Sequence, residues 1–95
     1  MNPLAPDIAY GRAPIAPLHE VLRATARWNT AKAASTASAA EHEDRRAAGA
    51  SKPYIAGKHR NVAAELRADA VRHRLNATEC DTVRAEMLAD VRRAA

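Results

Sequence analysis

The sequence of 95 residues contains no Phe, one Trp, two Tyr, one Cys and three Gly. It also lacks runs in which β-branched and polar residues alternate, which excludes a β sandwich and a doubly wound nucleotide-binding sheet. Only 20 side chains are apolar and larger than Ala, whereas Ala occurs 25 times. So few large groups exclude a large enzyme, and they predict an all-α chain that is partly disordered or oligomeric.

Long apolar segments are also missing. After the N-terminal residues, the longest stretch without a charge or a His is the eight small residues 33–40, whereas a membrane-spanning helix needs roughly 20 apolar residues. Four Pro among the first 17 residues interrupt any apolar signal segment. A single Cys cannot form an internal disulfide, which fits a reducing compartment. We therefore expect a cytoplasmic protein, or one held within a phage or another assembly.

The positive charge is evenly spread. The net charge is +4, and residues 1–57 and 58–95 each contribute +2. Twelve of the 15 basic residues are Arg, and this bias together with the many Ala indicates a GC-rich genome, such as that of an actinobacterium or its phage. Proteins that bind nucleic acids usually cluster their cations. The even spread makes nucleic acid the less favoured class of partner.

The first 16 residues predict an extended arm. They contain three Pro and Gly11, which block a helix and disfavour a central strand. The alternative is a disordered terminus. Four large apolar side chains lie on the arm, and we expect them to contact a neighbouring subunit or another protein: Leu4, Ile8, Tyr10 and Ile15.

Residues 17–50 predict a long Ala-rich helix. Pro17 suits a first helical turn, and large apolar residues follow at helical spacing as far as Trp28, which we expect to bind a partner. No apolar side chain from residue 29 to residue 53 is larger than Ala. This second half is either a close-packed Ala seam or a solvated connector, and we favour the connector.

After a basic turn at residues 51–60, residues 61–95 predict a C-terminal helical pair. The first helix, Asn61 to Leu75, has two opposite apolar faces and should therefore contact two neighbours. One face holds Val62, Ala63, Leu66 and Ala70, and the other holds Ala64, Ala68, Val71 and Leu75.

The second helix of the pair is expected to begin at Ala77. Asn76 is followed three residues later by Glu79, which is the spacing of a capping box. Four side chains then recur on one stripe, which we expect to be buried: Cys80, Val83, Met87 and Val91. The two helices and a single-residue turn could be read as a helix-turn-helix, but acidic residues on the exposed face disfavour contact with phosphates.

Few groups are candidates for chemistry. Glu65, Asp69 and His73 stand four residues apart on the helix, but a surface ion pair between Asp69 and His73 explains them as well as a metal would. No Gly-rich cofactor loop or nucleophile with a fixed base is present, so we expect no catalytic residues, no metal and no cofactor. A basic group beside a helix N-terminus is a candidate anion or nucleic-acid contact: Lys52, Lys58, His59 and Arg60.

We therefore expect a small non-enzymatic helical protein that acts by protein–protein interaction. It would be an assembly component, as a homo-oligomer or subunit, or a phage-encoded modulator of a host protein. The alternative is a nucleic-acid-binding accessory protein that uses residues 52–60.

Overall fold

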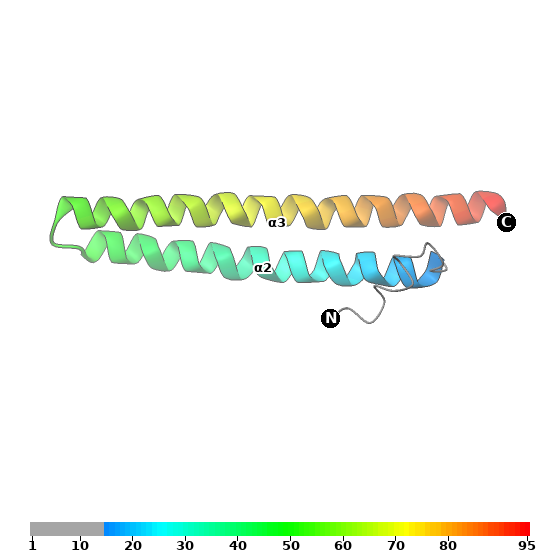
Figure 1. The fold of residues 1–95 in the computed structure, drawn as a ribbon, viewed down its shortest axis with the longest axis horizontal. Helices are drawn as coiled ribbons and strands as arrows, with labels where there is room; N and C mark the ends of the chain where they lie inside the picture. The colour runs from blue at the N-terminus through cyan, green and yellow to red at the C-terminus, as the bar shows by residue number, and fades with distance from the viewer. Residues whose placement is uncertain (1–14) are drawn as a thin grey trace, which may run out of the picture.

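The computed structural model describes residues 15–95, with side chains from Pro17 onward. The described chain is an antiparallel hairpin of two helices, α2 (Ile15–Gly49) and α3 (Pro53–Ala94), as Figure 1 shows. The hairpin is 65 Å long and 14 Å across its thinnest dimension. The all-α class is confirmed.

Helix α2 follows the prediction closely. It begins at Ile15, two residues before Pro17, and it ends at Gly49, one residue before the predicted end at residue 50. Ile15 is therefore helical rather than part of an extended arm. Residues 1–14, which carry Leu4, Ile8 and Tyr10, lie outside the described residues.

The predicted basic turn at 51–60 is wrong for most of its length, because α3 begins at Pro53. Proline suits this position, since its fixed φ is helical and its missing N–H would have no intrahelical partner. The carbonyl of Lys52 accepts hydrogen bonds from the N–H groups of Ile55 and Ala56, both at 3.1 Å. Only residues 50–52 connect the two helices.

The predicted C-terminal helical pair is also wrong. Helix α3 continues through Asn76 without a break for 42 residues, so the described chain contains no helix-turn-helix. An exposed Asn costs less than about 0.7 kcal/mol in a helix interior. In return, the unbroken helix keeps Ala77 and Arg84 opposite α2, where Ala77 is buried. Packing along the whole of α2 thus overrides the local capping signal.

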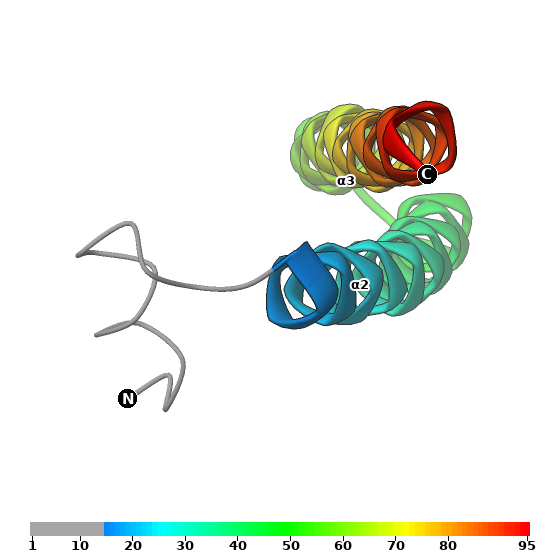
Figure 2. The same cartoon turned by 90° about the vertical axis from the view of Figure 1, so that its right-hand side faces the viewer.

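Alanine forms the seam between the helices, which lie side by side in Figure 2. Every buried apolar residue of the described chain is an Ala, and on each helix these recur every seventh residue. Such a seven-residue repeat on both helices lets them pack along their length, and small side chains allow close approach. The Ala seam consists of Ala26, Ala33, Ala40 and Ala47 on α2 and Ala56, Ala63, Ala70 and Ala77 on α3.

The favoured interpretation of residues 29–53 as a solvated connector is therefore wrong. Three seam residues, Ala33, Ala40 and Ala47, lie in this segment with at most 4% of their surface exposed. Burying a methyl group contributes only about 0.8 kcal/mol. The seam can nevertheless hold the hairpin, because it repeats over eight positions.

The C-terminal apolar stripe is less buried than predicted. Val83 and Val91 are 38% and 41% exposed, while Cys80 and Met87 are half-buried. The reason is the register of the hairpin, which places these residues at the edge of the interface and near the end of α2. They leave apolar surface uncovered within the single chain.

Candidate interaction surfaces

Four side-chain pairs join the two helices and fix the register of the hairpin, two near the loop, one in the middle and one near the open end. They are Glu43 with His59, Asn29 with His73, His19 with Arg84, and Asp44 with Arg67. In the first pair Nδ1–H of His59 donates to Oε2 of Glu43 at 2.6 Å. In the third, Nε–H of Arg84 donates to Nε2 of His19 at 3.1 Å.

The middle pair is the most enclosed. Asn29 is 5% exposed, and its amide group donates to the carbonyl of Thr25 at 3.0 Å. Its Oδ1 must accept from Nδ1–H of His73, at 2.9 Å, because an amide oxygen has no proton to give. The His73 ring also meets Trp28 edge to face, with 5.6 Å between ring centroids. His73 is thus a register-setting residue, and Asp69 pairs with Arg72 instead.

Two carboxylates near the loop are held in their charged form by α3. The hydrogen bond from His59 lowers the pKa of Glu43 below its ordinary value of 4.5. The hydrogen bond from Arg67 lowers the pKa of Asp44 below 3.8, and the same contact raises the pKa of Arg67. Both pairs join α2 to α3, so they tie the two helices together near the loop.

These pKa shifts predict an acid-sensitive hairpin. Because the folded-state pKa of Glu43 and of Asp44 is depressed, their contribution to stability is present above about pH 4.5 and is lost as the pH falls through the folded-state values. We expect the thermal midpoint to fall between pH 5 and pH 3, measured by circular dichroism. Glu43→Gln should make this fall shallower. Glu86→Gln, at an exposed position, should leave the fall unchanged. An equal fall of the thermal midpoint in both variants would contradict the contribution of Glu43 to the acid sensitivity.

The cationic residues expected to bind an anion are not gathered into one cluster. His59 faces α2 and is bonded to Glu43. Lys58 and Arg60 are exposed, but two residues along a helix turn the side chain by about 200°, so they lie on opposite sides of α3. Lys52 lies in the connection before the helix.

Trp28 is 60% exposed, as a partner-binding residue would be. It belongs to an uncharged row along α2, with residues alternately three and four apart, and the Trp28 ring at the edge of this row also contacts His73 of α3. We call this row the outer α2 stripe: Pro17, Val21, Ala24, Trp28, Ala31, Ser35 and Ser38.

Helix α3 has a longer row of the same kind. Of the two opposite faces predicted for residues 61–75, the one with Ala63 and Ala70 packs on α2, while the one with Val71 and Leu75 stays exposed. Because α3 does not end at Asn76, the exposed face continues to its C-terminal part. We call it the outer α3 stripe: Tyr54, Gly57, Asn61, Ala64, Ala68, Val71, Leu75, Thr78, Thr82, Ala85 and Ala89.

Open grooves run along the seam. One open groove of about 300 Å³ is lined by Leu22, Asn29 and Cys80, with Glu79 at its edge. Among residues 15–95, no three His, Cys, Asp or Glu side chains are grouped closely enough to hold a metal ion. The features that set the described chain apart are therefore its two exposed, uncharged stripes.

Comparison of the chain with protein-family models, with curated proteins and with solved structures gave no match. No helix among the described residues is long and apolar enough to cross a membrane. The function must accordingly be argued from the residues themselves.

Proposed function

We propose that this chain is a non-enzymatic interaction protein, which works as a subunit of a larger helical assembly. The observation that carries the proposal is the placement of its large apolar side chains. No large side chain among the described residues is fully buried, and eight large apolar ones are 38% to 63% exposed. A stable single-chain protein normally buries such groups in its core.

Both outer stripes support this proposal. In a chain with 27% charged residues, the outer α3 stripe carries none over eleven positions and the outer α2 stripe none over seven. A surface helix normally places charged residues opposite its buried face. Helices with apolar or uncharged residues on both faces are suited to contact a second neighbour.

The concentration dependence of the thermal midpoint tests this proposal. If the native state is an assembly, mass action should raise the midpoint as the protein concentration increases a hundredfold. A complex with nonspecific DNA is the competing outcome, and its affinity would fall steeply with salt. A midpoint independent of concentration, together with salt-sensitive DNA binding, would favour the nucleic-acid function instead.

A further inference from the structure

The outer α3 stripe has the geometry of a second helix-packing face. Its residues alternate three and four apart from Tyr54 to Ala89, which is the pattern that places α3 against α2 on the other side. Three of its side chains are large and open to solvent, with Tyr54 and Leu75 63% exposed and Val71 48% exposed. In Figure 1 no other described element lies along the side of α3 that is turned away from α2.

We propose that this stripe binds a second copy of the chain, with the two α3 helices antiparallel, Ala68 opposite Val71 of the second copy and Ala64 opposite its Leu75. This inference rests on the proposed function and names its partner. A row with alternating spacings reads the same in both directions, so it can pair with itself about a two-fold axis. In this register a small residue faces a larger one at each central layer, which lets the helices approach closely.

The charges beside the stripe select this register. One flanking row contains Lys58, Glu65, Arg72 and Glu79, and the other contains Arg60, Arg67, Arg74 and Asp81. In the proposed register Lys58 faces Glu79 of the second copy and Glu65 faces its Arg72. On the other flank Arg60 faces Asp81, and the two-fold axis repeats each contact. Opposite charges at such flanking positions set partner choice and orientation.

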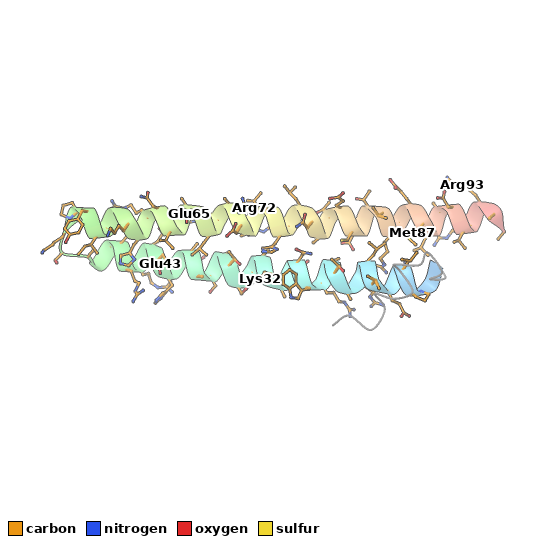
Figure 3. The ribbon with its side chains drawn as sticks, in the orientation of Figure 1. Lys32, Glu43, Glu65, Arg72, Met87 and Arg93 are labelled. Atoms are coloured by element: carbon orange, nitrogen blue, oxygen red, sulfur yellow. The ribbon has the colours of Figure 1, made fainter. Side chains whose placement is uncertain are left out.

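Only one flanking pair has like charges in this register, Arg67 facing Arg74. Arg67 is already bonded to Asp44 of its own hairpin, which offsets its charge. Moving one helix by seven residues would instead place Glu65 against Glu79 and Arg72 against Arg72. Glu65 and Arg72 are labelled on α3 in Figure 3.

Several of these flanking charges are available for a partner. Lys58, Arg60, Glu65 and Glu79 are exposed and form no ion pair within residues 15–95.

The helices would overlap from residue 54 to residue 85, a length of about 48 Å at 1.5 Å per residue. We estimate a total buried area of about 1,000 Å², which reaches the lower range of specific interfaces.

Disulfide formation between copies tests the face and the register. In a Cys80→Ala background, the pair Ala64→Cys and Leu75→Cys should give a covalent dimer on oxidation, visible on a non-reducing gel. The two positions are 11 residues apart on one helix, about 16 Å, so they cannot bond within one chain. The matched control, Ala64→Cys with Thr82→Cys, reports the register shifted by seven residues and should not cross-link.

The outcomes separate this inference from the proposed function. Cross-linking of the control pair alone would overturn the proposed register. Cross-linking of neither pair in a protein that still sediments as a dimer would overturn the α3 interface and leave association intact. A protein that is monomeric at every concentration and forms no cross-link would overturn both. Efficient cross-linking of the first pair alone supports both.

A charge exchange gives a second readout that does not depend on cysteine chemistry. Lys58→Glu and Glu79→Lys should each weaken dimerisation at least tenfold, because each places like charges opposite each other twice. The double variant should restore affinity to near that of the original chain. Arg45→Glu, an equivalent charge change on α2, is the control and should leave dimerisation unchanged. Failure of the double variant to recover would overturn the proposed register.

Discussion

Replacing Ala63 by Leu should destabilise the hairpin, although the change adds apolar surface to a buried position. Ala63 has no exposed surface, and it faces the Ala seam of α2. Additional methylene groups force the helices apart, which typically costs 1–3 kcal/mol in a filled core. For a domain of this size we expect the thermal midpoint to fall by roughly 10–15 °C, measured by circular dichroism.

Ala39→Leu is the matched control, because residue 39 is exposed on α2 and lies outside the outer α2 stripe. Ala and Leu both favour helices, so the two substitutions differ mainly in packing. A midpoint for Ala63→Leu equal to or above that of the control would mean that the helices are not in close contact at the seam.

Proline at residue 78 should be strongly destabilising, because α3 is continuous there. Thr78 is exposed and far from both helix ends, and proline in a helix interior removes a hydrogen bond and clashes with the preceding turn, at a cost of about 3 kcal/mol or more. If a second helix began at Ala77 instead, residue 78 would lie in its first turn, where proline is tolerated. We expect Thr78→Pro to lower the thermal midpoint by more than 10 °C relative to Thr78→Ala. Equal midpoints would restore the two-helix interpretation of residues 61–95.

The sequence allowed the all-α class to be predicted, and the ends of α2 to within two residues, because Pro17 suits a first helical turn and the Ala-rich segment favours a helix. It also showed that residues 61–75 have two apolar faces; Ala70 on one face is buried, while Leu75 on the other is exposed, so contact with a second neighbour stays a prediction. These features depend on neighbours along the chain. Helix periodicity alone is enough to find them.

The Ala seam was one of the two alternatives predicted for residues 29–53, but the connector was favoured over it. Ala recurs every seventh residue from Ala26 to Ala47 and from Ala56 to Ala77. Counting only apolar side chains larger than Ala hid this repeat and made residues 29–53 look like a connector. A search for residues of any size at intervals of seven would have found it.

The continuity of α3 and its polar contacts could not be predicted in the same way. Asn76 and Glu79 carry a genuine local capping pattern, and only the packing of α2 against residues beyond Asn76 overrides it. The bond between Glu43 and His59 depends on the register of two helices, which separate local signals do not determine. Trp28 was expected on a partner surface; it is exposed, and its contact with a partner stays a prediction.

A single hairpin leaves apolar surface exposed, and we propose that a second copy covers it. Sedimentation equilibrium of the full chain measures whether the two copies associate. The chain has a mass of 10.2 kDa, and we expect about 20 kDa at concentrations of tens of micromolar, with dissociation on dilution. A mass of 10.2 kDa at every concentration, with full helicity retained, would contradict the proposal.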